Sequence, residues 1–405
     1  MNYRTAFLKN LEIRNLLGNL NLILEEVITK DKYDLFPQMI SILDKIEKLL
    51  RFNNDEQITI YLKQLLEQNK KAEIIKEFCG SITDLMELCD NFACKNKIDE
   101  NFLELYKNIF DMGLETLESW MIDNFKNYYT NETDNAKNLL KSYNRVLYWG
   151  RLDYEKENYE LIHNRAAVLI NYAEEIIWMY FNLSDYTSKE IMTKVLCNWV
   201  TFSHSYLRKM PRNRYSQYFD YDLIDGDGGE IFVDAGACMG DTVDSFVSHF
   251  KKYRIIYSYE ITPDTFQKLK NNVRKYKNVV CKCQGLSDKK GMMYLTLCED
   301  IGGNRLGDTG ETEVPVTTLD DDIKESIDFI KMDIEGAEYG ALEGARRHIV
   351  EEHPKLAIAA YHNNLDIFRL ARLIYSMEPR YRFYFRYYGG TLYPNDYVLY
   401  AVVRD

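Results

Sequence analysis

The spacing of hydrophobic residues differs between the two halves of the chain. In residues 1 to about 170, apolar side chains recur at steps of three and four positions, for example at Met39, Ile42, Leu43 and Ile46, and glycine is scarce. This spacing puts the apolar side chains on one face of a helix. It predicts a bundle or array of antiparallel helices in this half of the chain.

From about residue 225 onward, glycine is frequent and short apolar runs alternate with helical patterns. The strand candidates are Ile231–Ala235, Ile255–Glu260, Val279–Leu286, Phe329–Ile334 and Leu356–Tyr361, and the helix candidates between them are Asp241–Phe250, Thr265–Lys275, Glu338–Val350 and Leu365–Met377. This alternation predicts a doubly wound parallel sheet. Two final strand candidates, Arg382–Tyr387 and Tyr397–Val403, are separated only by a turn, so we expect an antiparallel hairpin there. A parallel sheet with such an ending suggests a methyltransferase more than a dehydrogenase.

A chain of 405 residues is too long for one ordinary hydrophobic core. We therefore expect an all-α accessory domain at residues 1–170, a connector with lead-in helices at 171–225, and an α/β domain at 226–405. No part of the sequence predicts a role for the accessory domain, which could bind a protein partner or mediate self-association.

A glycine turn follows the first strand candidate. Gly236 and Gly240 are separated by three residues, so the Gly-x-Gly-x-x-Gly fingerprint of dinucleotide-binding proteins is not matched. Asp241 and Thr242 open the next helix, and a carboxylate at that position repels a pyrophosphate. A cationic ligand without phosphate, such as S-adenosylmethionine, suits this loop better, and a nicotinamide-dependent oxidoreductase is disfavoured.

Other candidate cofactor-binding residues stand where the first three strand candidates end. Asp234 either orders the glycine turn or reaches the amino acid moiety of the ligand. Glu260 has the position at which a carboxylate accepts hydrogen bonds from both ribose hydroxyls. Ser287 and Asp288 are placed to bind the exocyclic amine of adenine, although an ordinary turn is nearly as good an interpretation.

The candidate catalytic residues follow the fourth and fifth strand candidates. Asp333 and Glu335 point the same way if the strand continues, so both could line the reaction cleft, whereas Glu338 in part only charges the first turn of a helix. His362 titrates near neutral pH, and it or Asp333 is the candidate base. The two carboxylates could instead hold Mg²⁺, but their spacing does not demand it, and we predict no metal ligand.

These motifs together resemble those of the FkbM-type methyltransferase family. The resemblance is carried by Phe232–Gly236, Val316–Asp320, Phe329–Glu338, Tyr361–His362 and Val398–Ala401, and it covers about residues 175–405. It implies a class I Rossmann-like fold, S-adenosylmethionine as methyl donor, and O-methylation of a sugar, a glycan or a natural-product hydroxyl. One departure is that Ile261 and Thr262 stand between Glu260 and the proline that commonly follows the glutamate directly.

Composition limits the partners. A net charge of −12 argues against a sequence-independent grip on nucleic acid phosphates. The sequence shows neither a signal-peptide core at its start nor an apolar run long enough to span a bilayer, so we expect a cytoplasmic protein. The expected partner is a small-molecule or glycan acceptor. The alternative function is a helical protein-interaction module that carries a degenerate nucleotide-binding domain.

Overall fold

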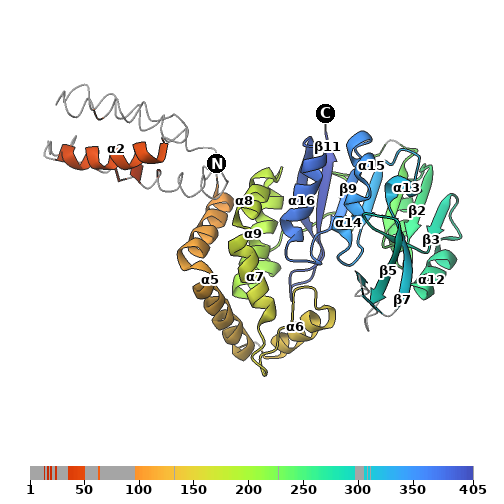
Figure 1. The fold of residues 1–405 in the computed structure, drawn as a ribbon, viewed down its shortest axis with the longest axis horizontal. Helices are drawn as coiled ribbons and strands as arrows, with labels where there is room; N and C mark the ends of the chain where they lie inside the picture. The colour runs from red at the N-terminus through yellow and green to blue at the C-terminus, as the bar shows by residue number, and fades with distance from the viewer. Residues whose placement is uncertain are drawn as a thin grey trace. The chain divides into compact units, whose positions relative to one another are not determined.

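The computed structural model describes residues 13, 16–17, 19–20, 23–24, 35–50, 63, 96–131, 133–226, 228–296, 305–307, 309–310 and 312–404. Contacts divide the chain into two compact units, Met1–Leu103 and Glu104–Asp405. Figure 1 shows the fold of each unit. The division predicted from the sequence, with boundaries at residues 170 and 225, stays a prediction.

The described part of the first unit is helical. Helix α2 spans Phe36–Leu50. Its residues Met39, Leu43 and Ile46 are fully buried. Their spacing of three and four positions is the pattern that predicted a helix, and a helical N-terminal region is confirmed.

The second unit contains helices ahead of its sheet. They are the C-terminal part of α5 (Lys97–Asn131), α6 (Thr133–Val146), α7 (Glu160–Asn171), α8 (Ala173–Asn182), α9 (Tyr186–Thr201) and α10 (His204–Arg208). Helix α9 begins where the Asp185 carboxylate accepts a hydrogen bond from the Ser188 N–H group, at 2.7 Å. Ser188 in turn bonds the backbone of Phe385, so this helix is tied to the sheet.

A seven-stranded sheet forms the centre of the second unit, in the order β10-β11-β9-β8-β1-β2-β3. The strands are β1 (Ile231–Ala235), β2 (Ile255–Tyr259), β3 (Val279–Lys282), β8 (Phe329–Met332), β9 (Lys355–Ala359), β10 (Tyr381–Tyr387) and β11 (Tyr397–Val403). The first five are parallel, whereas β11 pairs antiparallel with both β9 and β10. The carboxyl ends of β1, β2 and β8 therefore lie at one edge, and an α/β fold is confirmed.

The third strand candidate is divided between two sheets. It ends as β3 at Lys282, and its last two residues form β4 (Gly285–Leu286), which pairs with β7 (Thr312–Thr317) in a second sheet. That sheet has the order β4-β7-β5-β6, with β5 at Gly291–Thr296 and β6 at Arg305–Gly307. β3 pairs with β2, whereas β4 pairs with β7, which is distant in sequence. The apolar run alone did not indicate that its last residues would join a different sheet.

Six helices follow the first strand in the described part of the α/β region. They are α11 (Asp241–His249), α12 (Pro263–Val273), α13 (Leu319–Asp322), α14 (Glu338–Glu343), α15 (Arg346–Glu351) and α16 (Asp366–Met377). The single helix expected at Glu338–Val350 is broken into α14 and α15. At the break, a Cβ on Gly344 would lie 2.1 Å from the carbonyl oxygen of Ser287, so the backbone passes too close for any side chain.

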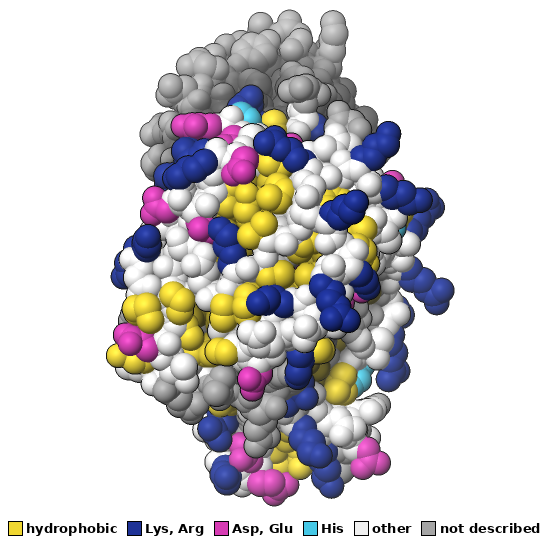
Figure 2. All heavy atoms as spheres, turned by 90° about the vertical axis from the view of Figure 1, so that its right-hand side faces the viewer, with side chains coloured by type: hydrophobic (Ala, Val, Ile, Leu, Met, Phe, Trp, Pro, Cys, Tyr) yellow, Lys and Arg dark blue, Asp and Glu magenta, His cyan; other side chains and the backbone are white. Residues whose placement is uncertain are grey.

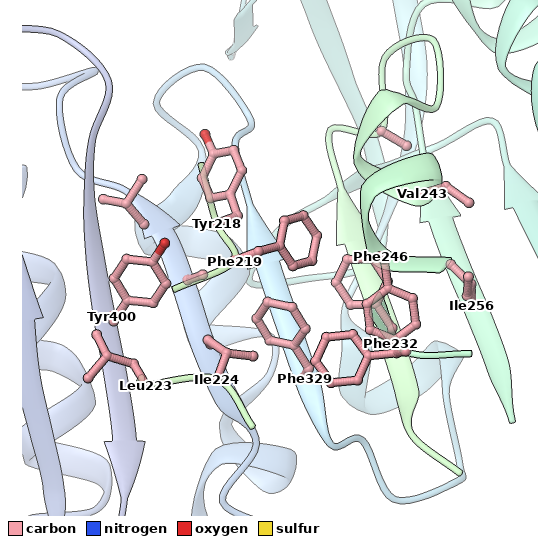
Figure 3. Packing of buried hydrophobic residues seen from close by; sticks show 14 of the residues in the cluster. Tyr218, Phe219, Leu223, Ile224, Phe232, Val243, Phe246, Ile256, Phe329 and Tyr400 are labelled. Carbon is pink, nitrogen blue, oxygen red and sulfur yellow. The ribbon is translucent and has the colours of Figure 1, made fainter. Parts of the chain in front are cut away.

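An aromatic stack holds β1, β8 and α11 together (Figure 3). The ring of Phe232 lies 4.2 Å from that of Phe246 and 4.9 Å from that of Phe329, measured between centroids. Stacked rings of this kind contribute more to stability than the burial of their apolar area alone. They hold the amino-terminal parts of β1 and β8 against each other and against α11.

The surface charge is uneven. Figure 2 shows a face on which lysine and arginine side chains outnumber acidic ones and surround apolar patches. The net charge of −12 therefore does not describe this face. Within the described residues, no helix combines the length and the apolar character that crossing a membrane requires.

Candidate functional site

A cavity of about 300 Å³ lies at the carboxyl ends of β1, β2 and β8. Six of the predicted site residues line it: Gly236, Asp241, Thr242, Glu260, Asp333 and Glu335. The other five do not line it: Asp234, Gly240, Ser287, Asp288 and His362. The structure therefore brings most of the predicted residues to one place.

The glycine turn after β1 forms the floor of the cavity. Gly236 has a φ of +75°, and a Cβ there would lie 1.8 Å from the carbonyl oxygen of Asp333. The N–H groups of Gly236 and Ala237 both donate to the carbonyl oxygen of Tyr259, at 3.0 and 2.9 Å. Only glycine allows the backbone to come this close to β2 and to the loop after β8. Gly240 supports the turn from outside the cavity as the residue that precedes α11.

Glu260 is held with its carboxylate toward the cavity. One oxygen accepts the N–H group of Cys238 at 3.1 Å, and the other accepts the N–H group of Thr262 at 2.7 Å. Burial raises the pKa of Glu260, although these hydrogen bonds oppose the rise. Each carboxylate oxygen has a second lone pair, so the group can still accept hydrogen bonds from a ligand.

The departure from the family pattern after Glu260 has a structural consequence. Pro263 begins α12, where it fits the first helical turn, and Thr262 precedes it. In this loop the N–H group of Thr262, two residues after Glu260, donates to the Glu260 carboxylate. The carboxylate is therefore kept in place by the altered loop.

Asp234 lies behind the wall of the cavity and pairs with Lys331. Both side chains are buried, and Lys331 Nζ lies 3.1 Å from Asp234 Oδ1. Lys331 also donates to the carbonyl oxygens of Ala235 and Gly236, at 3.2 and 2.7 Å. Burial lowers the pKa of Lys331, but the charges of Asp234 and Asp333 outweigh it and the net shift is upward. Of the two roles predicted for Asp234, this geometry favours ordering the turn, through Lys331 and not through backbone N–H groups.

Ser287 and Asp288 bond each other beside the cavity. Ser287 Oγ donates to Asp288 Oδ1 at 3.0 Å. Gln284, Gly285 and Leu286 line the cavity instead. A role for Ser287 or Asp288 toward adenine stays a prediction.

Asp333, Glu335 and His362 converge at the other end of the site. His362 Nε2 lies 3.4 Å from Asp333 Oδ1 and 3.3 Å from Glu335 Oε2. His362 Nδ1 lies 2.8 Å from Glu338 Oε1, and both of these side chains are buried. Glu338 is thus a partner of the histidine as well as the first residue of α14.

The electrostatics of this group do not favour His362 as a base. Burial lowers the pKa of His362, but the charges of Glu338, Glu335 and Asp333 outweigh burial and raise it to about 10. Burial raises the pKa of Glu335 to about 7. A histidine that keeps both protons at neutral pH has no lone pair with which to accept another.

Two tyrosines complete the site, and sequence reasoning did not connect either of them with the carboxylates. Tyr218 donates from its hydroxyl to Asp333 Oδ2 at 2.7 Å. Tyr148, which follows α6, donates to Glu335 Oε2, and the next residue, Trp149, donates to the carbonyl oxygen of Tyr361 at 2.9 Å. No spacing in the sequence connects Tyr148 with the carboxylates.

Comparison with protein families gives one match over this region. Residues 234–389 match the family model of the methyltransferase FkbM domain. The segment contains Glu260, Asp333, Glu335 and His362. The segment is similar to the FkbM methyltransferase domain, and the resemblance inferred from the sequence is confirmed.

Solved structures agree with this assignment. The chain is similar to an FkbM methyltransferase from Methylobacillus flagellatus, with 26% identity and a TM-score of 0.51 over 58% of this chain and 61% of the other. The chain thus spans less than two thirds of the length of that protein. The described structure has a methyltransferase-like α/β fold with a helical N-terminal region. A comparison with curated proteins gives no match.

Two further solved structures are more distant. One is an rRNA methylase from Streptococcus thermophilus, with 14% identity and a TM-score of 0.31 over 51% of this chain and 96% of the other. The second is a putative methyltransferase from Streptococcus mutans in complex with SAH, with 11% identity and a TM-score of 0.27 over 44% of this chain and 89% of the other. TM-scores this low carry no argument about fold or function.

Proposed function

From the FkbM methyltransferase domain at residues 234–389, we propose that this chain transfers a methyl group from S-adenosylmethionine to a hydroxyl oxygen. The observation that carries the proposal is the cradle around Glu260, whose two oxygens are fixed by backbone N–H groups and keep lone pairs for a ligand. The sheet is then a class I Rossmann-like methyltransferase sheet with an antiparallel hairpin at its end.

The residues of the cavity fit this cofactor. Glu260 suits a ribose with two free hydroxyl donors, and the close backbone at Gly236 leaves room for the nucleoside. Asp241, at the first turn of α11, would repel a diphosphate but not a sulfonium cation. Because these cavity features are intact, they do not favour the alternative of a degenerate nucleotide-binding domain.

When bound, S-adenosylmethionine supplies a strongly electrophilic methyl group. The protein then has to orient the acceptor oxygen, exclude water and receive a proton. Asp333 and Glu335 line the cavity, so they are the groups that we assign to the acceptor hydroxyl. His362, which faces both carboxylates, is assigned a positioning role instead of that of the base.

The acceptor class is proposed from the family resemblance and from these carboxylates. Carboxylates that face a cavity accept hydrogen bonds from hydroxyl groups, as a sugar, a glycan or a polyhydroxylated natural product would offer. Residues 1–170 are proposed as an accessory domain that binds a protein partner or mediates self-association. Incubation of candidate glycans and nucleotide sugars with labelled donor tests the acceptor class. A label on nitrogen or carbon would contradict O-methylation.

Substitution of Glu260 tests the cofactor assignment. Glu260→Gln removes the charge and sets an amide N–H₂ against a backbone N–H group, so we expect S-adenosylhomocysteine to bind about 10-fold to 100-fold more weakly in calorimetry. Asp264→Asn is the matched control, since Asp264 is an exposed carboxylate nearby in the sequence, in the first turn of α12. Equal affinity of wild type and Glu260→Gln would refute the assignment.

A further inference from the structure

Three potential ligand atoms meet beside the cavity, and the proposed transfer does not explain their arrangement. They are Asp333 Oδ1, Glu335 Oε2 and His362 Nε2, and all three lie within 4.8 Å of one another. Asp333 and Glu335 line the cavity, while the side chain of His362 is only 1% exposed. The three atoms come from the ends of β8 and β9, which are adjacent parallel strands.

The separations between these atoms are not those of hydrogen bonds. His362 Nε2 lies 3.3 and 3.4 Å from the two carboxylate oxygens, beyond the usual range for N–H···O contacts. His362 Nε2 and Asp333 Oδ1 are both buried without a hydrogen-bond partner. Two ligands of a tetrahedral ion with bonds of about 2.0–2.1 Å are separated by about 3.3–3.4 Å. The two carboxylate oxygens therefore lie at the distance from His362 Nε2 that two ligands of one ion have.

Each of the three side chains is also held in place by a hydrogen bond with a neighbouring residue. Glu338 fixes the ring of His362 through Nδ1, at 2.8 Å, and accepts the N–H groups of Ile334 and Gly336. Tyr218 donates to the other oxygen of Asp333, whereas Tyr148 donates to Glu335 Oε2, the ligand atom itself, which has a second lone pair for an ion. A carboxylate on the far nitrogen of a histidine is the usual support of a metal-binding histidine.

We propose that Asp333 Oδ1, Glu335 Oε2 and His362 Nε2 bind a divalent transition-metal ion. The ion displaces the proton that Nε2 carries in its absence, and that proton is released to solvent. Two carboxylates balance its charge, and the imidazole favours Zn²⁺, Co²⁺ or Mn²⁺ over Mg²⁺ and Ca²⁺, which prefer oxygen ligands. The sequence alone predicted no metal ligand, because the spacing of the two carboxylates permits an ion but does not demand one.

Three protein ligands leave a position of the ion open toward the cavity. If the proposed function holds, the hydroxyl oxygen of the acceptor occupies that position, where the ion orients it and favours its ionised form. Coordination through Oε2 leaves Glu335 Oε1 uncoordinated. The binding of the ion itself does not depend on methyl transfer.

Direct metal binding tests the site in the full chain. The protein is treated with a chelator and dialysed, and uptake of Zn²⁺ is measured by mass spectrometry, while Co²⁺ binding is followed by its visible absorption. We expect one ion per chain in the wild type, and at least tenfold weaker binding in Glu335→Gln and His362→Ala. His163→Ala, which removes a half-exposed histidine outside the site, should bind as the wild type does. A circular dichroism spectrum of each variant verifies that it is folded.

The results separate this inference from the proposed function. Absence of stoichiometric uptake by the wild type, or unchanged uptake in the folded Glu335→Gln variant, would overturn the metal site. Binding of Mg²⁺ as tight as that of Zn²⁺ would overturn the class of ion. S-adenosylhomocysteine binding is measured in parallel on the chelator-treated protein. If the protein binds S-adenosylhomocysteine but takes up no metal, only the metal site is refuted. If it takes up metal but does not bind S-adenosylhomocysteine, only the proposed function is refuted.

Discussion

Lys331 and Asp234 form an ion pair that is almost completely removed from solvent, with 3.1 Å between Nζ and Oδ1. The same ammonium group donates to the carbonyl oxygens of Ala235 and Gly236. The lysine of β8 therefore ties its own strand to the end of β1 and to the glycine turn. This pair supports the floor of the cavity. Lys331 lines the cavity, whereas Asp234 does not.

Lys331→Met should destabilise the protein strongly. The substitution leaves the Asp234 carboxylate buried without a counter-charge, which costs about 3–5 kcal/mol of the free energy of unfolding. Urea denaturation measures the loss. Lys289→Met, at an exposed lysine, should change stability by no more than about 0.5 kcal/mol. The double variant Asp234→Leu/Lys331→Met should recover part of the loss, and a double variant no more stable than Lys331→Met would show that the unpaired charge is not the cause.

Gly236→Ala should disrupt the floor of the cavity. Its Cβ would overlap the carbonyl oxygen of Asp333, at 1.8 Å, and its φ of +75° is unfavourable for alanine. We expect a loss of at least about 2 kcal/mol of stability and weaker binding of S-adenosylhomocysteine. Gly291→Ala is the control, because a Cβ there meets nothing within 4 Å. Similar behaviour of the two variants, by urea denaturation and calorimetry, would contradict this account of the turn.

Much of the fold follows from apolar runs and glycine positions. The run at Ile231–Ala235 coincides with β1, and the helical pattern from Leu365 coincides with α16 to within one residue. The division of the third strand candidate and the break at Gly344 could not be predicted in this way. Both depend on contacts with segments distant in sequence, namely β7 and the carbonyl oxygen of Ser287.

The candidate site was predictable where it depends on strand ends. Glu260, Asp333 and Glu335 were identified because the carboxyl ends of parallel strands meet at one edge of a sheet. The direction of a side chain at such an end is set by local packing, which is why Asp234 faces Lys331 and not the cavity. Tyr148 reaches Glu335 from a helical region far earlier in the chain, and no sequence pattern records that approach.

The start of α9 should make stability depend on pH. Asp185 accepts hydrogen bonds from the Ser188 N–H group and from Arg386, at 2.7 and 2.8 Å. Burial alone would raise the pKa of Asp185, but the bonds from Arg386 and Ser188 outweigh it and the net shift is downward. The unfolded chain, with a carboxyl pKa of about 3.9, therefore binds more protons than the folded protein as the solution is acidified. The stability that Asp185 contributes is present above that value and is lost as the pH falls through the lower folded pKa.

Asp185→Asn isolates this contribution, because asparagine also begins helices well. We expect the variant to be about 1–3 kcal/mol less stable than the wild type at pH 7, with the difference shrinking as the pH approaches the folded pKa. Urea denaturation at a series of pH values measures the difference in stability at pH 7 and its change with pH. Asp264→Asn, at an exposed position, should show no such convergence. A difference between wild type and Asp185→Asn that is constant with pH would exclude the carboxylate as its source.

The last prediction concerns where the α/β domain begins. A fragment of residues 226–405 lacks Asp185 and Asp220, which pair with the buried guanidinium of Arg386 at 2.8 and 2.5 Å. It also lacks Tyr218, the partner of Asp333, and a buried charge left without its partners is strongly destabilising. We expect this fragment to show no cooperative thermal transition by circular dichroism and no binding of S-adenosylhomocysteine. The fragment 104–405, which is one compact unit, should keep both. Cooperative unfolding and full affinity of 226–405 would mean that the helices before the sheet are dispensable for the site.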